Sequence, residues 1–174
     1  MGSDKAMVRL AGRPILDWIV GRLRPQAEAL AINANDERFA GIGLPIIKDL
    51  PSSTTTPLAG LHASLRWASE AGFDALLTAP SDSPFLPLDL ATRLADQSPA
   101  IAVSGGQRHF LTGLWPIGLL ADFEATRYHR ARDWVAHCGA TAIAWDDSPF
   151  DPFLNINTPG DLAQAERIAA LFSP

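Results

Sequence analysis

Asp82 has both the side chain and the position that metal binding would need. It lies in the polar segment 78–84, directly after a short apolar run that predicts a strand. Ligands of open α/β sheets collect outside the carboxyl ends of the strands. A lone carboxylate there suits Mg²⁺, which takes one or two protein oxygens and fills its other positions with water and phosphate. The alternative is a structural turn stiffened by Pro80 and Pro84, in which Asp82 accepts backbone N–H bonds.

A second polar cluster spans residues 153–162 and joins an apolar run to a helix start. If residues 153–157 end a strand, Asn155 and Asn157 share one face, where their amide oxygens could ligate a metal or bind a ligand. The residues that follow suit a helix start, with a capping hydroxyl, a first-turn proline and an acidic side chain that complements the helix dipole: Thr158, Pro159 and Asp161. A purely structural role for the cluster therefore stays open.

Smaller polar groups could bind the parts of an anionic ligand. Lys5 follows a flexible turn at Gly2 and could contact phosphate oxygens as a point charge, although terminal lysines are usually solvated. Amide and carboxylate side chains that could bind a base or a ribose, or simply line a polar loop, are Asn33, Asn35, Asp36 and Asp49. A local basic concentration could hold a second anionic substrate or form a solvated helix face: Arg108, His109, Arg127, His129, Arg130 and Arg132.

The elements that would position these groups alternate between helices and short apolar strands. Helical spacing of apolar residues predicts helices over residues 14–24, 58–72 and 159–171. Apolar runs predict strands at 29–32, 45–48, 74–79, 101–104, 110–115 and 140–145, and residues 50–56 read as a loop. The runs that flank Gly105-Gly106 indicate an antiparallel excursion. The pattern predicts one α/β domain over residues 1–174, with a mostly parallel, mixed sheet covered on both faces.

Composition excludes several classes of partner. The formal charge is −5, from 14 basic and 19 acidic residues, so no overall positive field exists to hold a nucleic acid. A single cysteine, Cys138, excludes an internal disulfide and a multi-thiolate metal site, and it fits a reducing compartment such as the cytoplasm. No apolar run approaches the roughly 20 residues that span a bilayer, and the N-terminus lacks the pattern of a signal peptide. The sequence therefore predicts neither a nucleic-acid nor a membrane partner.

In order along the chain, several segments resemble the molybdenum cofactor guanylyltransferase (MobA) family: MGSDKAMVRLAGRPIL, INAND, IIKD, PLAGL, TAPSDSPFLP, RHF and DPFLNINTPGDL. They span nearly the whole chain in the family's order. The resemblance implies a three-layer, Rossmann-like nucleotidyltransferase fold. It also implies transfer of GMP from GTP to molybdopterin, release of pyrophosphate and a requirement for Mg²⁺. A molybdoenzyme or another protein of the cofactor pathway would be a further partner.

The resemblance also assigns roles to individual residues. On the nucleotide side, Lys5 would contact the phosphates, and Asn33 and Asp49 would contact the nucleoside. Asp82 would bind both GTP and Mg²⁺. Near the metal and the acceptor it places the paired asparagines Asn155 and Asn157. Candidates for the pterin side are Arg108, His109 and Arg130. Lys5 and Asp82 would be the catalytic pair.

The start of the sequence departs from the family pattern. Members ordinarily begin with a strand followed by LAGGxSxRMG, whose backbone amides wrap the phosphates, whereas this sequence starts at the final MG. A start assigned at an internal methionine, a truncation or a loss of activity would each explain this. We expect a sheet that lacks one strand, and weak GTP binding by the 174-residue form. The alternatives are a molybdopterin cytidylyltransferase, a sugar-phosphate nucleotidyltransferase and a non-catalytic partner subunit.

Overall fold

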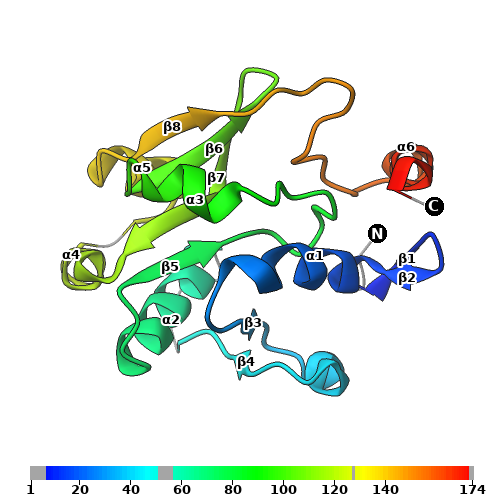
Figure 1. Cartoon of the computed structure of the whole chain (residues 1–174). Helices are drawn as coiled ribbons and strands as arrows, with labels where there is room; N and C mark the ends of the chain where they lie inside the picture. Colours follow the sequence, from blue (N-terminus) through cyan, green and yellow to red (C-terminus); the bar gives the residue numbers. More distant parts are fainter. Residues whose placement is uncertain (1–6, 51–56, 127, 173–174) are drawn as a thin grey trace.

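The computed structural model describes residues 7–50, 57–126 and 128–172 (Figure 1). Its strands are β1 (Arg9–Leu10), β2 (Arg13–Pro14), β3 (Ile32–Asn33), β4 (Ile46–Ile47), β5 (Ala75–Thr78), β6 (Ala100–Ser104), β7 (Gln107–Pro116) and β8 (Thr141–Ala144). Its α-helices are α1 (Ile15–Leu23), α2 (Pro57–Glu70), α3 (Leu90–Ala95), α4 (Leu120–Ala125), α5 (Ala131–His137) and α6 (Pro159–Ala169). Short 3-10 segments are η2 (Arg24–Gln26), η3 (Glu37–Ile42), η4 (Ile117–Leu119) and η5 (Ala170–Phe172).

The largest sheet is mixed and has the strand order β5-β7-β6-β8. β5 and β6 both run antiparallel to β7, and β8 runs parallel to β6, so β7 is the one reversed strand in this sheet. The reversal is made by the hairpin at Gly105 and Gly106, whose φ angles of 51° and 75° suit a two-residue type I′ turn. The predicted antiparallel excursion and the mixed character of the sheet are therefore confirmed, although two of the three pairings in this sheet are antiparallel.

Helices cover both faces of this sheet and give the fold three layers (Figure 1). Side chains of β6 alternate between the two faces, because successive strand residues point in opposite directions. Ala100 and Ala102 pack with α1, α3 and α6 in one core, whereas Ile101 packs with α2, α4 and α5 in the other. Each core contains fully buried large side chains, such as Phe85 and Trp134, and each of these stabilises the fold by roughly 1.5–3 kcal/mol.

Local chemistry explains where the main helices begin and end. Pro14 precedes the first residue of α1, and the chain leaves α2 through Gly72, whose φ of 79° favours glycine. At the start of α6 the Thr158 side chain accepts from the Asp161 N–H, while the Asp161 side chain accepts from the Thr158 N–H. This reciprocal arrangement is a capping box, and the predicted helix start is confirmed. The predicted loop 50–56 lies almost wholly outside the described residues.

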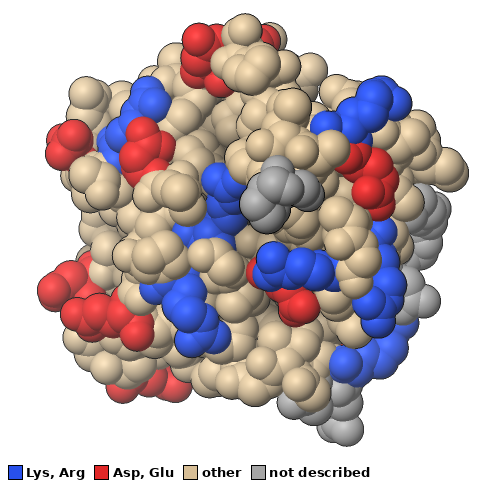
Figure 2. All heavy atoms as spheres, turned by 45° about the vertical axis from the view of Figure 1, so that its right-hand side comes forward, with Lys and Arg blue, Asp and Glu red and all other residues tan. Residues whose placement is uncertain are grey.

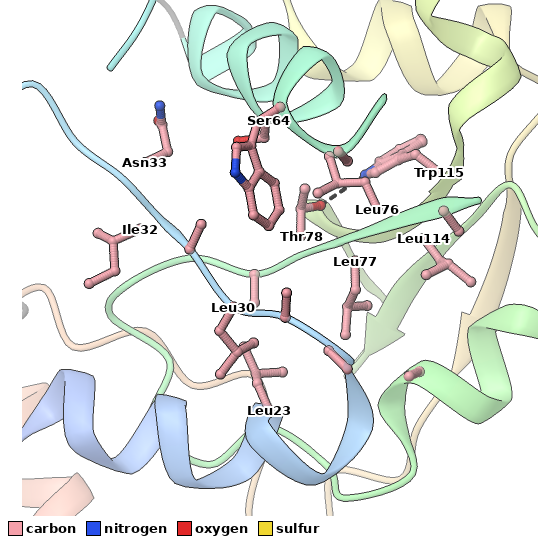
Figure 3. A pocket seen from close by; sticks show the side chains of 18 of the residues that line it. Leu23, Leu30, Ile32, Asn33, Ser64, Leu76, Leu77, Thr78, Leu114 and Trp115 are labelled. Carbon is pink, nitrogen blue, oxygen red and sulfur yellow. Dashed lines mark hydrogen bonds between the residues drawn. The ribbon is translucent and has the colours of Figure 1, made fainter. Parts of the chain in front are cut away.

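The strand predicted at residues 29–32 is shorter than expected and shifted, because β3 covers only Ile32 and Asn33. β3 pairs with β4 in parallel through short ladders on one edge. Across its other edge lies a cavity of about 950 Å³, which α1 and α2 also line and which separates β3 from β5. In Figure 3 the side chains of Leu30 and Ile32 lie on one side of this cavity and those of Leu77 and Thr78 on the other.

The cavity lies between the sheet of β3 and β4 and the sheet that begins with β5. Among the described strands, β3 pairs only with β4 and β5 only with β7, so two strand edges flank the cavity without a ladder between them. Within the described ranges, no helix is both long and apolar enough to cross a membrane.

Candidate functional site

Asp82 lies in the loop after β5, and the structure ties this loop to the segment before α6. The Ile156 N–H donates to the backbone oxygen of Asp82 at 2.9 Å. The Ser83 hydroxyl donates to Asn155 Oδ1 at 2.6 Å, and Ser83 is only 1 % exposed. A buried hydroxyl without a partner would cost free energy, so this bond favours one arrangement of the two segments. The loop of Asp82 and the segment of Asn155 are thereby brought together.

The segment that carries Asn155 and Asn157 is irregular and is not the strand end that the sequence suggested. Its backbone groups bond outside any ladder, because Ile156 donates to Asp82 and the Asn157 N–H donates to Asp161 Oδ2 at 2.9 Å. Ile156 is fully buried, whereas both flanking asparagines are exposed. Both asparagines are therefore accessible at the surface, even though no strand places them there.

A second polar cluster forms where β3 and β4 end side by side. Asp49 accepts from both neighbouring amides: Asn33 Nδ2 donates to its Oδ1 and Asn35 Nδ2 to its Oδ2, each at 2.9 Å. The Asp49 N–H in turn donates to Asn35 Oδ1 at 2.9 Å. Two parallel strands bring these residues together at their carboxyl ends, where ligands of such sheets bind. Three of the four residues that the sequence offered for a base or a ribose are therefore brought together: Asn33, Asn35 and Asp49.

Asp36 does not join this cluster. Its carboxylate caps η3 by accepting from the Arg38 N–H at 2.9 Å, and it bonds the Arg38 guanidinium at 2.6 Å. These bonds lower the pKa of Asp36, with the side-chain bond from Arg38 as the largest cause. Asp36 therefore serves the local turn, which was the ordinary explanation for the polarity of this loop.

Two residues that sequence reasoning missed hold these clusters in place. Ser83 orients Asn155, and Gly60 of α2 lies against Asn33 and Asp49. The only signals in the sequence were a serine inside the segment TAPSDSPFLP and a glycine inside the otherwise regular helix of PLAGL. Both act through contacts with residues far away in the sequence, so spacing alone could not identify their partners.

One residue of the amide–carboxylate cluster and one of the Asp82 loop line the same cavity. Asn33 lies at its rim, near Gly60 and Ser64 of α2, and Ser81 lines it immediately before Asp82 (Figure 3). Thr78 also lines the cavity, but its hydroxyl accepts from Trp115 Nε1 at 2.9 Å and so belongs to the core packing of β5 and β7. Asn33 at the end of β3 and Ser81 in the loop after β5 thus both line this cavity.

The basic candidates are not gathered at one place. Lys5 lies outside the described residues, as does Arg127. Arg108 and His109 are successive residues of β7, so their side chains point to opposite faces of the sheet. His109 packs against Phe153, which belongs to the core of α1, α3 and α6, whereas Arg130 immediately precedes α5 in the other layer. Of the three pterin-side candidates, His109 is the one that contacts the segment leading to Asn155.

Charge on the surface is mixed rather than uniformly basic. Figure 2 shows basic side chains over one face with acidic side chains between them. An anionic ligand would therefore be bound by local contacts, in agreement with the net charge of −5. Among the described residues there is no group of three His, Cys, Asp or Glu side chains that could hold a metal. The described residues therefore offer no site in which protein side chains alone would enclose a metal.

This arrangement of a three-layer α/β fold, an amide–carboxylate cluster at strand ends and a carboxylate loop beside it defines a nucleotidyltransferase type of domain. Residues 1–142 match the family described as the MobA-like NTP transferase domain, and the chain belongs to that family. A molybdenum cofactor guanylyltransferase of Cereibacter sphaeroides is 45% identical, over 96% of this chain and 89% of the relative. One of Rhodopseudomonas palustris is 42% identical, over 97% and 87%.

Solved structures share the fold. The molybdopterin-guanine dinucleotide biosynthesis protein A of Archaeoglobus fulgidus superposes with a TM-score of 0.69 at 21% identity, covering 98% of this chain and 92% of that one. The 2-C-methyl-D-erythritol 4-phosphate cytidylyltransferase of Thermus thermophilus superposes with a TM-score of 0.66 at 18% identity, covering 97% and 95%. Because these identities are low, the likeness concerns the fold alone, and it confirms the fold class predicted from the sequence.

Proposed function

We propose that this chain transfers GMP from GTP to molybdopterin and releases pyrophosphate. One observation carries the proposal: the backbone bond from Ile156 to Asp82 and the side-chain bond from Ser83 to Asn155 hold a carboxylate loop beside the two exposed asparagines. Membership of the MobA-like family and the names of the relatives support the choice of substrates.

In this reaction a terminal phosphate oxygen of molybdopterin attacks the α-phosphorus of GTP. A new P–O bond forms there, the bond from the α-phosphorus to the bridging oxygen breaks, and pyrophosphate leaves with that oxygen. The protein supplies no covalent nucleophile, so its contribution is positioning and neutralisation of charge. Asn33 and Asp49 would hold the nucleoside, since their amide and carboxylate groups match the donors and acceptors of a base or ribose. Lys5 would contact the phosphates.

The donor set around Asp82 fits Mg²⁺ bound mainly by substrate. Mg²⁺ needs only one or two protein carboxylates when phosphates and water complete its shell, which agrees with a lone carboxylate beside amide oxygens. Asp82 would hold the ion, and the exposed amides of Asn155 and Asn157 lie on the adjacent segment. When bound, Mg²⁺ neutralises charge on the phosphates as a Lewis acid.

We also propose the cytoplasm as the compartment in which the enzyme works. Burial raises the pKa of the Cys138 thiol to about 12, with the nearby charge of Asp122 adding to the shift. A thiol with so high a pKa is poorly reactive, and it is the only cysteine of the chain. The chain therefore carries no thiol pair that an oxidising compartment could use within one molecule.

Nucleotide competition tests the proposal. The purified 174-residue chain, with and without Mg²⁺, is incubated with molybdopterin and either GTP or CTP, and pyrophosphate release and dinucleotide formation are measured. Dinucleotide formed from GTP in preference to CTP supports the proposal. A preference for CTP would identify a cytidylyltransferase, and transfer to a sugar phosphate in place of molybdopterin would identify a sugar-phosphate enzyme. Nucleotide binding without transfer to any acceptor would favour a non-catalytic partner subunit.

A further inference from the structure

Three polar side chains link the β6–β7 hairpin to the segment that leads to Asn155. Ser104 ends β6 and is only 2 % exposed, and its hydroxyl donates to Asp151 Oδ1 at 2.7 Å. The same hydroxyl oxygen lies 2.8 Å from Nε2 of His109, across the hairpin on β7. The imidazole of His109 packs against Phe153, with ring centroids 4.8 Å apart. The hydrogen bonds therefore connect Asp151 to Ser104 and Ser104 to His109.

The donor and the acceptor in each of these two hydrogen bonds follow from the chemistry of the Asp151 carboxylate. A carboxylate only accepts, and Asp151 Oδ1 also accepts from the Phe153 N–H at 2.9 Å. The one proton of the Ser104 hydroxyl is therefore directed to Asp151, which leaves its oxygen to accept from His109. Nε2 of His109 must be the donor in that bond. A neutral His109 thus carries its proton on Nε2 and a lone pair on Nδ1.

The surroundings of His109 favour its neutral form. Burial lowers the pKa of His109, and the negative charge of Asp151 opposes that shift without cancelling it. The arrangement also differs from a hydrolytic triad, in which histidine lies in the middle and removes the proton of serine. Here the serine lies in the middle and gives its proton to the carboxylate, so Ser104 is not activated as a nucleophile.

We propose that Ser104 and Asp151 are positioning residues that hold His109 in the Nε2–H tautomer and present its Nδ1 to an N–H or O–H donor of the second substrate. The identity of that substrate rests on the proposed function, since a pterin ring carries such donors. The assignment of the tautomer is independent of the proposed function. Asp151 also begins the segment that carries Asn155, which is bonded to Ser83. One segment therefore aligns the imidazole and the Asp82 loop.

Nitrogen chemical shifts measure the tautomer directly. Long-range ¹H–¹⁵N spectra of the intact chain near neutral pH should show His109 with a protonated Nε2 and an unprotonated Nδ1. A His109→Gln variant assigns the signal among the four histidines. Ser104→Ala should shift His109 toward a mixture of tautomers, because Nε2–H loses its acceptor. Asp151→Asn should keep the tautomer, since the Phe153 N–H holds the amide oxygen in the position of Oδ1 and Ser104 still donates to it.

A matched control separates this effect from the loss of any hydroxyl near the strand. Ser98 precedes β6, is half-buried, and its hydroxyl bonds the Leu114 carbonyl at 3.4 Å, far from His109 in the strand register. Ser98→Ala should leave the His109 signals unchanged. A wild-type chain with the proton on Nδ1 would overturn the proposal, as would a folded Ser104→Ala chain with the wild-type tautomer. If Ser104→Ala does not fold, Asp151→Ala, which removes the same acceptor from Ser104, decides the question.

A separate measurement tests the contact between Nδ1 of His109 and the second substrate. Ser104→Ala should raise the KM for molybdopterin by about tenfold, the equivalent of one oriented hydrogen bond, and change the KM for GTP little. An altered tautomer with an unchanged molybdopterin KM would overturn the assignment of Nδ1 to that substrate. If the wild-type chain transfers no GMP, the proposed function fails. The tautomer spectra then still decide the positioning roles, and a molybdopterin titration of wild type and Ser104→Ala decides the contact.

Discussion

Gly60 of α2 lies so close to Asn33 that a Cβ built on it would fall well inside the van der Waals distance of Asn33 Oδ1 and 3.0 Å from its Cγ. The Asn33 amide cannot simply move aside, because its Nδ2 donates both to Asp49 Oδ1 at 2.9 Å and to the Ile47 carbonyl at 3.1 Å. A helix glycine normally costs up to about 1 kcal/mol relative to alanine. At this position the absence of a side chain lets the helix approach the proposed nucleoside-binding cluster.

We predict that Gly60→Ala weakens GTP binding by about tenfold or more. The added methyl forces Asn33 to rotate and give up hydrogen bonds worth about 0.5–1.5 kcal/mol each, which exceeds the gain in helix propensity. Calorimetric titration with GTP and thermal unfolding measure the two effects. Gly21→Ala is the matched control, because Gly21 lies in α1 with nothing within 4 Å of an added Cβ. That variant should be slightly more stable and should bind GTP normally.

A double variant tests whether Asn33 transmits the effect of Gly60. Asn33→Ala alone removes the amide that the added methyl would strike, so Gly60→Ala should cause little further loss of GTP affinity in that background. Fully additive losses would show that Gly60 acts by another route, and the assignment of Asn33 to the nucleoside would lose its support.

We predict that Asp82→Ala abolishes most Mg²⁺-dependent GMP transfer and leaves the fold intact. The loop is held to Ile156 by the backbone oxygen of Asp82, which the substitution keeps. A loss of roughly 100-fold or more is expected if the carboxylate contributes as much as one oxyanion contact. Turnover and the melting temperature are measured together, with Asp74→Ala as control, since Asp74 is an exposed acid at the opposite end of β5. Near-normal turnover would disprove the metal role, and unfolding would support the structural turn.

We predict that Asn157→Ala lowers the rate of transfer more than it lowers GTP affinity. The bond from the Asn157 N–H to Asp161 belongs to the backbone and survives the substitution, so the start of α6 should stay intact. Thr158→Ala is the contrasting variant, because it removes the capping hydroxyl and should cost about 1 kcal/mol of stability. Binding and turnover assays separate the two. If Asn157→Ala changes only the melting temperature, its side chain serves the helix start and not the reaction.

The parts of the fold that the sequence predicts well are those whose cause is local. Turn chemistry at Gly105 and Gly106 fixes the β6–β7 hairpin, and the residues 158–161 specify the start of α6 by themselves. The sequence does not predict helix α5, because its two large apolar residues, Trp134 and Val135, are adjacent and do not repeat at helical spacing. Only the packing of these two side chains into a core makes that segment a helix.

The candidate site shows the same division. The grouping of Asn33 with Asp49 could be predicted, because each follows an apolar run and parallel strands end at one edge of a sheet. The bond from Ser83 to Asn155 could not, since it joins residues 72 positions apart and neither has a distinctive local pattern. The strand end considered for residues 153–157 does not form, because the Ile156 N–H bonds the Asp82 loop instead of a neighbouring strand. Long-range contacts of this kind leave no spacing signal.

Our last prediction concerns the cavity between β3 and β5. Two strand edges with apolar residues on both sides flank about 950 Å³ there, and an exposed edge invites association with other chains. The 174 residues alone should therefore bind GTP weakly and should not be monodisperse. Adding an apolar strand and an LAGGxSxR segment before residue 1 should improve both properties, because the strand can pair with both edges and the loop supplies backbone N–H groups to the phosphates.

An extension of equal length in which glycine and serine replace the strand is the control for this prediction. It keeps the phosphate loop but cannot fill the cavity with apolar side chains, so it should not restore monodispersity. GTP titration and light scattering compare the three forms. A lysine ammonium is a strongly hydrated point charge on a flexible stem, so Lys5 alone cannot replace several fixed N–H donors. Full-strength GTP binding and a monodisperse solution of the 174-residue form would show that the added strand is dispensable and that the phosphates are bound by other residues.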